Sequence, residues 1–174
     1  MKLSHSLTIL TATCLLSLIT LCASAPRPDR PPPSDGSQFL AAHNAARASL
    51  GAGLRPLVWD PEVAKFAQSY ANMRKGDCAL RHSSNMKYGE NIFWGSGSQW
   101  APAQAVGAWF SEKRWYNYGS TSCARGQMCG HYTQIVWRST QRLGCAKVVC
   151  SGGKGVFITC NYDPPGNYVG ERPY

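Results

Sequence analysis

Apolar side chains recur at helical spacing in three segments of the chain. The clearest pattern follows Asp60, which can cap a helix, and Pro61, which suits the first helical position. The spacing of the apolar residues after Pro61 predicts an amphipathic helix that ends before Gly76. The apolar positions repeat at i, i+3, i+4, i+7 and i+8, and they are Val63, Phe66, Ala67, Tyr70 and Ala71.

Two further helices are predicted, one before and one after this segment. The first runs from Ser37 to Leu50, with Gly51 placed to end it. Its inward face carries Phe39, Leu40, His43, Ala46 and Arg47. The other runs from about Pro102 to Trp115, and its inward residues are Val106, Trp109 and Phe110.

Strand patterns are concentrated near the C-terminus. Residues 143–150 and 155–162 are rich in β-branched and aromatic side chains, and the turn residues Ser-Gly-Gly-Lys separate them. This arrangement predicts a β-hairpin. Because helices come first and strands later, the chain is expected to have an α+β fold and not a parallel α/β sheet.

The N-terminus has the composition of a secretory signal peptide. Lys2 is followed by an apolar run at 7–21 and by small residues at 23–25. Residues 1–25 are therefore predicted to be a signal peptide, cut after Ala25 or slightly earlier because Pro26 disfavours cleavage. The run is short for a spanning helix, so no membrane-spanning segment is expected. Residues 26–36 form a Pro-rich linker, and 37–174 form one domain.

Six cysteines follow the predicted signal peptide. An even number in a small secreted domain predicts three disulfides, with all fifteen pairings open on counting alone. The chain lacks Cys-x-x-Cys pairs, and export favours oxidation, so cysteine-bound zinc is not expected. Gly-x-Ser-x-Gly and His-Glu-x-x-His are also absent, which disfavours a serine hydrolase or a zincin-type protease. The cysteines are Cys78, Cys123, Cys129, Cys145, Cys150 and Cys160.

The chain is basic. Loss of residues 1–25 removes Lys2 and no acidic residue, so the formal charge falls from +9 to +8. Outside the cell, this charge favours anionic partners such as cell-wall polysaccharide or anionic lipid. The alternative is that the charge only maintains solubility. Nucleic acid is not expected as a partner, since the sequence contains no Lys/Arg run or nucleic-acid-binding motif.

A few titratable residues could carry chemistry. His43 has apolar helix neighbours and is predicted to be structural. His82 and His131 each follow a cysteine closely, in stretches that look like loops, and Glu90 and Glu112 are two of only nine acidic residues. Together these four residues could bind a divalent metal ion or perform acid/base chemistry. Alternatively, they form a polar network that only fixes the fold.

Aromatic residues gather near the end of the third predicted helix. Their spacing suits the wall of an apolar groove for a flat lipid, although most aromatics at such spacings belong to a core. The candidate lipid-binding residues are Phe110, Trp115, Tyr116 and Tyr118.

Four segments resemble the CAP superfamily of cysteine-rich secretory proteins, antigen 5 and pathogenesis-related 1 proteins, and its plant pathogenesis-related-1 branch in particular. The resemblance extends from about Ser37 to Tyr174. It implies an α-β-α sandwich with a small antiparallel sheet flanked by helices. It also implies the disulfides Cys78–Cys150, Cys123–Cys129 and Cys145–Cys160. The segments are His43-Asn44-x-x-Arg47, Gly89-Glu90-Asn91-Ile92, the run Gly-His-Tyr-Thr-Gln-Ile-Val-Trp at 130–137, and residues 157–168.

The resemblance also implies sites. It places His82, Glu90, Glu112 and His131 in one cleft, where the two histidines hold a divalent cation such as zinc in some relatives. No cofactor is required by this interpretation. Sterol binding is attributed in the family to a loop that corresponds here to residues 115–129. Relatives also release a C-terminal defence peptide, which here would be Pro164 to Tyr174, cut after Asp163.

These features predict a secreted, monomeric plant defence protein of the apoplast or cell wall. Antifungal and anti-oomycete action is expected from binding sterols or related lipids, together with a role as precursor of the C-terminal peptide. Catalysis is not expected. The alternative is a metal-dependent hydrolase or protease that uses the His/Glu cleft.

Overall fold

The computed structural model describes residues 34–84 and 86–174. The predicted signal peptide at 1–25 and nearly all of the predicted linker lie outside these residues. Within the described part of the chain, no helix is long and apolar enough to cross a membrane.

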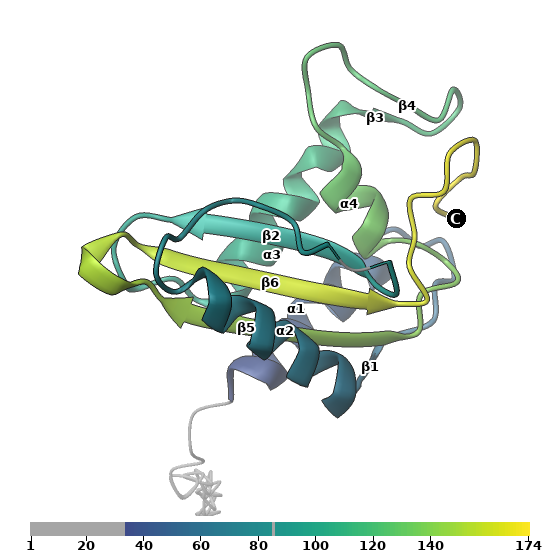
Figure 1. The fold of residues 1–174 in the computed structure, drawn as a ribbon. Helices are drawn as coiled ribbons and strands as arrows, with labels where there is room; N and C mark the ends of the chain where they lie inside the picture. Colours follow the sequence, from purple (N-terminus) through teal and green to yellow (C-terminus); the bar gives the residue numbers. More distant parts are fainter. Residues whose placement is uncertain (1–33, 85) are drawn as a thin grey trace, which may run out of the picture. The chain divides into compact units, whose positions relative to one another are not determined.

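A four-stranded sheet forms the middle layer of the domain (Figure 1). Its strands lie in the order β1 (Val58–Trp59), β5 (Arg142–Val149), β6 (Val156–Asp163) and β2 (Gly89–Gly95). β2, β5 and β6 pair antiparallel, whereas the two-residue β1 pairs parallel with β5. The predicted hairpin is confirmed, and its turn contains the short 3₁₀ helix η2 (Ser151–Gly153).

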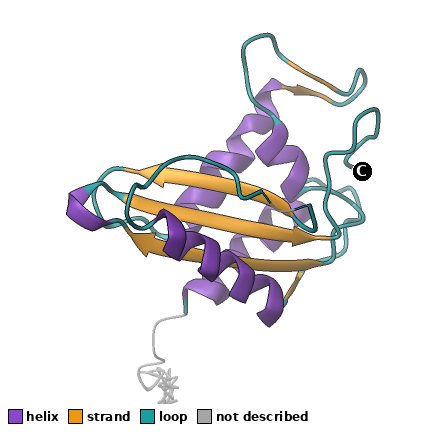
Figure 2. Cartoon of the chain, viewed as in Figure 1, coloured by secondary structure: helices purple, strands orange, loops and turns teal. Residues whose placement is uncertain are grey.

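Helices cover both faces of this sheet (Figure 2). α2 (Pro61–Arg74) packs over β5 and β6 on one face. On the other face lie α1 (Asp35–Ala48), α3 (Pro102–Phe110) and the short α4 (Gly130–Ile135), which contact one another and the sheet. The predicted α+β class and the α-β-α layering are confirmed.

α2 follows the sequence pattern closely. Asp60 Oδ1 accepts hydrogen bonds from the backbone N–H of Glu62 and Val63, at 2.8 and 3.1 Å, which caps the helix. The helix lies so close to the sheet that a Cβ at Gly144 of β5 would lie 2.1 Å from the backbone nitrogen of Ala64. Glycine at this position therefore permits the layers to approach. The buried face consists of Val63, Ala67, Tyr70 and Ala71.

The other two predicted helices differ from the structure at their ends. α1 begins at Asp35, two residues inside the predicted linker, because Ser34 Oγ accepts from the Ser37 N–H at 3.2 Å and caps it. α3 ends at Phe110, and the 3₁₀ helix η1 (Ser111–Trp115) replaces the last predicted turn. The prediction of a single helix to Trp115 was therefore wrong, and Phe110 is only half-buried.

Several elements were not predicted from the sequence. The Gly89-Glu90-Asn91-Ile92 motif opens strand β2, which pairs with β6 along its whole length. The stretch around His131 is not a loop but the short helix α4. A separate two-stranded sheet joins β3 (Tyr116–Asn117) to β4 (Ser122–Cys123).

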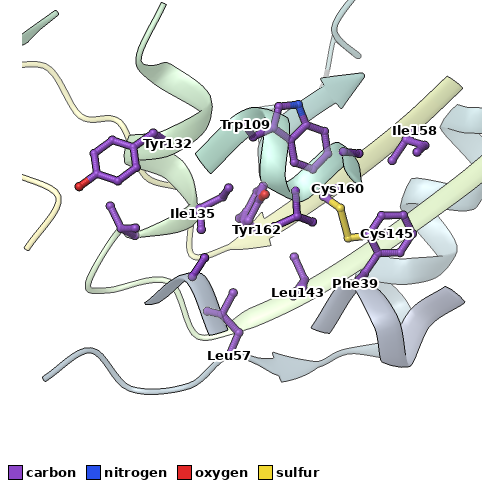
Figure 3. Close-up of a cluster of buried hydrophobic side chains, with 14 of the residues drawn as sticks. Phe39, Leu57, Trp109, Tyr132, Ile135, Leu143, Cys145, Ile158, Cys160 and Tyr162 are labelled. Carbon is purple, nitrogen blue, oxygen red and sulfur yellow. A yellow bond between two sulfur atoms is a disulfide. The ribbon is translucent and has the colours of Figure 1, made fainter. Parts of the chain in front are cut away.

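Two buried clusters and three disulfides stabilise these layers. The larger cluster fills the space between the sheet and α1, α3 and α4, and it includes Phe39, Trp109, Tyr132 and Leu143 (Figure 3). A second cluster lies beneath α2. The disulfides join Cys78 to Cys150, Cys123 to Cys129 and Cys145 to Cys160, which are the pairings that the resemblance implied.

Candidate functional site

The first Glu–His pair joins strand β2 to the loop before it. Glu90 Oε1 lies 2.9 Å from His82 Nδ1 and accepts from the Ser83 N–H at 2.8 Å. Glu90 Oε2 accepts from Ser83 Oγ at 2.6 Å and from Asn161 Nδ2 at 3.2 Å. The carboxylate is almost buried, with 5% of its side chain exposed, whereas 57% of the His82 side chain faces solvent. The pair therefore presents an oriented imidazole at the surface.

The environment of Glu90 favours its charged form. Burial by itself would raise the pKa of this carboxyl. Hydrogen bonds from His82, from the side chain and backbone of Ser83, and from Asn161 outweigh burial and lower the pKa below its ordinary value. Glu90 is therefore an ionised carboxylate, which can accept a hydrogen bond from an N–H at His82 Nδ1.

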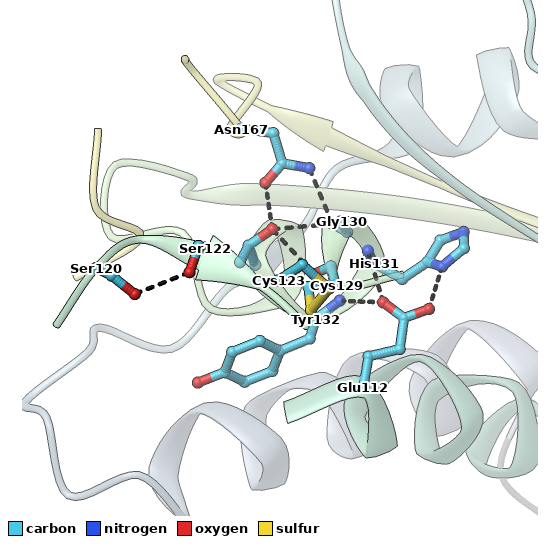
Figure 4. Close-up of a disulfide and its surroundings, with 10 residues drawn as sticks. Glu112, Ser120, Ser122, Cys123, Cys129, Gly130, His131, Tyr132 and Asn167 are labelled. Atoms are coloured by element: carbon cyan, nitrogen blue, oxygen red, sulfur yellow. Dashed lines mark hydrogen bonds and ion pairs between the residues drawn. A yellow bond between two sulfur atoms is a disulfide. The ribbon is translucent and has the colours of Figure 1, made fainter. Parts of the chain in front are cut away.

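The second Glu–His pair lies between η1 and α4 (Figure 4). Glu112 Oε1 lies 2.6 Å from His131 Nδ1. Its Oε2 accepts from the backbone N–H of His131 at 3.1 Å and of Tyr132 at 3.3 Å, which caps the first turn of α4. The ring of Trp109, one helical turn before Glu112, stacks on the His131 ring with 6.1 Å between centroids. The orientation of His131 is thus fixed on two sides.

Asn91 connects the two pairs. It follows Glu90 in β2, is 1% exposed, and donates through Nδ2 to the His131 carbonyl and to the Tyr162 hydroxyl, both at 3.0 Å. The predicted tetrad is therefore arranged as two Glu–His pairs bridged by a buried amide. Sequence reasoning used Asn91 only as part of a motif and did not identify this role.

Both histidines are arranged as metal ligands often are. A metal-binding imidazole usually donates its second ring N–H to a carboxylate, which fixes its tautomer. Here each Nδ1 faces a glutamate, and the described contacts leave both Nε2 atoms without a hydrogen-bond partner. However, no group of three His, Cys, Asp or Glu side chains in residues 34–84 and 86–174 is suited to hold a metal ion. The described residues therefore offer one oriented imidazole in each pair.

The four aromatic residues predicted to bind lipid do not form one surface. Phe110 and Tyr116 each pack on Tyr132, with 5.7 Å between ring centroids, and belong to the edge of the core. Trp115 and Tyr118 are 38% and 37% exposed. The Tyr118 ring stacks on the ring of C-terminal Tyr174 at 4.9 Å, and its hydroxyl donates to the Tyr174 backbone carbonyl.

A cavity of about 340 Å³ lies between the β3–β4 segment, α4 and the C-terminal tail. We call it the tail cavity. Tyr116, Trp137 and Tyr168 contribute aromatic rings to its wall. Asn167 ties the tail to α4, accepting from Thr133 Oγ1 at 2.6 Å and donating to the Gly130 carbonyl at 2.9 Å (Figure 4). Sequence reasoning missed this cavity because its walls come from segments far apart in the chain.

The sequence of the chain matches a known protein family. The family model described as "Cysteine-rich secretory protein family" (CAP) matches residues 40–162. The chain belongs to the CAP family. It is 65% identical over 138 residues to "Pathogenesis-related protein PR-1" of Medicago truncatula, covering 79% of this chain and 78% of that protein. It is 48% identical to "Pathogenesis-related protein PRMS" of Zea mays over the full length of both.

Solved CAP structures share the fold. The chain superposes on Na-ASP-1 with a TM-score of 0.71 at 29% identity, covering 82% of this chain and 41% of that chain. It superposes on "NaASP2 with Zn2+" with a TM-score of 0.66 at 31% identity, covering 84% of this chain and 88% of the other. Its similarity to plant pathogenesis-related proteins shows that the chain belongs to a plant defence family. Proteins of this family are secreted, which indicates an extracellular location.

The C-terminal tail of the CAP domain is firmly attached. Asp163 ends β6, where its carboxylate accepts from Arg142 Nη2 at 2.6 Å and its carbonyl accepts from the Gln141 N–H at 3.0 Å. At the far end, the Pro173 carbonyl accepts from the Arg138 N–H at 2.6 Å, and the Tyr174 and Tyr132 hydroxyls lie 2.9 Å apart. Release of the peptide after Asp163 stays a prediction, and it would require these bonds to break.

Proposed function

We propose that this protein is a secreted PR-1-type defence protein that binds a sterol or a related flat lipid of a microbe in the tail cavity. The observation that supports the proposal is the convergence of three aromatic rings, from Tyr116, Trp137 and Tyr168, on a cavity of about 340 Å³. This volume is at the lower end of the usual range for small-molecule sites. Removal of sterol from a membrane would harm a microbe that depends on an external supply.

The wall of the tail cavity suits a mostly apolar ligand with one polar group. Aromatic rings provide flat contact area for a fused ring system. A buried ligand hydroxyl needs a hydrogen-bond partner, and Thr133 and Asn167 offer such groups in the same wall. Val169, on the tail beside them, is fully exposed and would be covered by a ligand that extends beyond the cavity.

Replacing Tyr168 by alanine is expected to weaken binding of a fluorescent sterol by about tenfold, because a ring at the ligand surface is lost. Tyr168 is 51% exposed, so the change leaves the core intact. Titration of the oxidised protein, followed by fluorescence, measures the dissociation constant. Trp94→Ala, which removes a 45% exposed aromatic from β2, is the matched control and should bind normally.

Two outcomes would count against this proposal. Absence of saturable binding by the wild-type protein would refute sterol binding itself. A loss in a Trp115→Ala/Tyr118→Ala variant, with normal binding by Tyr168→Ala, would move the lipid to the exposed β3–β4 loop and away from the tail cavity.

We also propose that His82 and His131 bind a divalent cation through Nε2. The carboxylate on each Nδ1 supports this, as does the likeness of the fold to a relative solved with zinc, "NaASP2 with Zn2+". Such an ion would supply Lewis-acid polarisation or a bridging contact to an anionic ligand. Glu90 and Glu112 would act by orienting the two imidazoles.

Replacing His82 by alanine is expected to weaken Zn²⁺ binding by at least about tenfold, because one of two protein ligands is lost. Glu90→Gln should weaken it by a comparable factor through loss of imidazole orientation. Calorimetric titration of Zn²⁺ into the metal-free protein measures both effects. Equal Zn²⁺ affinity in wild type, His82→Ala and His131→Ala would refute this site.

A further inference from the structure

A buried arginine holds two surface loops in a fixed arrangement. Because β1 runs parallel to β5, with Val58 opposite Arg142, the segments that lead into these strands lie side by side. Arg47 is 1% exposed and donates through Nε and Nη2 to the Arg55 carbonyl, at 3.0 and 2.9 Å. Its Nη1 donates to the carbonyls of Ile135 and Trp137, both at 2.9 Å. The backbone that carries Arg55 and Arg138 is therefore rigid.

These loops enclose a cavity of about 490 Å³, which we call the two-arginine cavity. Arg55 and Arg138 both line it, and none of the carboxylates in residues 34–84 and 86–174 does. It shares no lining residue with the tail cavity. The other lining residues are Gly53, Pro56, Val58, Thr140 and Gln141.

The two guanidinium groups have no acidic partner among the residues that the structure describes. Arg74, Arg142 and Lys147 each pair with an aspartate, but neither Arg55 nor Arg138 forms an ion pair there. The side-chain contact of Arg138 is a 3.3 Å hydrogen bond from Nη2 to the Ala52 carbonyl. Both groups therefore keep donors available to an external anion.

Arg47 adds a third positive charge beneath the cavity. Burial lowers the pKa of Arg47 to about 10, and the charge of Arg138 contributes to the same shift. Arg47 stays protonated at neutral pH, so its charge adds to those of the two arginines that line the cavity. Like charges without a counter-charge attract an anion to the space between them.

We propose that the two-arginine cavity binds carboxylate groups of an acidic, uronic-acid-containing polysaccharide of the cell wall. Guanidinium groups match carboxylates in paired, bidentate hydrogen bonds. Thr140 and Gln141 supply polar groups for sugar hydroxyls, and the 64% exposed Val58 offers apolar surface to a sugar ring. The formal charge of +8 on the chain after residue 25 would draw such a polyanion toward the protein. This site would retain the protein in the wall independently of any lipid.

The test uses de-esterified oligogalacturonide and its methyl ester, which has the same sugars without charge. Calorimetry on the full mature protein is expected to show binding of the de-esterified form and at least about tenfold weaker binding of the ester. Arg55→Gln/Arg138→Gln should weaken binding of the de-esterified form by about tenfold or more. The matched control Lys65→Gln/Arg125→Gln removes the same charge from exposed positions elsewhere and should change affinity by less than about twofold.

Three results would overturn the proposal. An equal loss in the Lys65/Arg125 control would show diffuse attraction by net charge. Equal binding of the methyl ester would show that carboxylates are not recognised. Displacement of the oligosaccharide by inorganic phosphate at equal charge concentration would make this a small-anion site. Arg55→Gln alone guards against misfolding, because Arg55 is exposed and its side chain forms no ion pair with the described residues, and it should still weaken binding severalfold.

Discussion

Replacing Arg47 by methionine is expected to lower the free energy of unfolding by about 4 kcal/mol, since two buried carbonyls and one part-buried carbonyl would lose their donors. Arg47 donates four hydrogen bonds to the carbonyls of Arg55, Ile135 and Trp137, at 2.9–3.0 Å. Methionine fills a similar volume without any donor. Urea denaturation of the oxidised protein at neutral pH measures the change.

Two further variants separate the hydrogen bonds of Arg47 from its charge. Arg47→Lys keeps the charge but loses the planar fork that reaches two loops at once. We therefore expect the free energy of unfolding to fall by about half as much as in Arg47→Met. Arg55→Gln removes a guanidinium from an exposed side chain nearby and should change stability by less than about 0.5 kcal/mol. A loss below about 1 kcal/mol for Arg47→Met would show that water or backbone rearrangement satisfies the carbonyls.

The parts of the fold that were predicted correctly depend on local signals. Asp60 and Pro61 specify the start of α2, and the spacing of its apolar residues specifies its buried face. The β5–β6 hairpin follows from two β-rich runs around a glycine-containing turn. In both cases the residues that decide the structure lie within a few positions of one another, so a single sequence reveals them.

The elements that were missed depend on partners far away in the sequence. β2 is a strand because it pairs with β6, about 70 residues later, as in the Asn91–Cys160 pair. α4 has six residues, too few for a periodic pattern, and Glu112 caps it from another element. The 3₁₀ turn after Phe110 continues the helical spacing, so no sequence signal marks the change.

The candidate site, like the fold, was predicted only in part from the sequence. The four residues His82, Glu90, Glu112 and His131 were predicted from the scarcity of His, Asp and Glu and from the family resemblance, but which glutamate contacts which histidine required the structure. Arg55 and Arg138 are ordinary surface arginines in the sequence. Only the bonds of Arg47 to the Arg55 and Trp137 carbonyls and the parallel pairing of β1 with β5 reveal the two-arginine cavity.

A buried polar chain links the candidate site to helix α1. Asn91 donates to the His131 carbonyl and to the Tyr162 hydroxyl. The Phe39 carbonyl, 2.8 Å from His43 Nδ1, can only accept, so Nδ1 carries the proton. Nε2 of His43 therefore accepts from the Tyr162 hydroxyl, also at 2.8 Å. Every proton in the chain has one acceptor, which requires a neutral His43.

The stability of the protein is expected to fall by about 3 kcal/mol between pH 6.5 and pH 4 because of His43 alone. Burial lowers the pKa of His43 from 6.5 to about 4; the hydrogen bond to Phe39 opposes this shift and the charge of Arg47 adds to it. Between these values the unfolded chain binds a proton that the folded protein excludes, so unfolding becomes easier as pH falls. Below about pH 4 both states are protonated, and this contribution stays constant.

Urea denaturation at half-unit pH steps, in wild type and in His43→Gln, measures this effect. The variant should lose some stability at pH 7, since the Tyr162 hydroxyl loses its acceptor, but the slope between pH 4 and 6.5 should become much flatter. Glu90 does not account for the same slope: its lowered pKa makes stability fall with acid only from about its unfolded value of 4.5 downward. Parallel curves for the two proteins across pH 4–6.5 would show that His43 is already charged in the folded state, contrary to the polar chain that connects it to Tyr162 and Asn91.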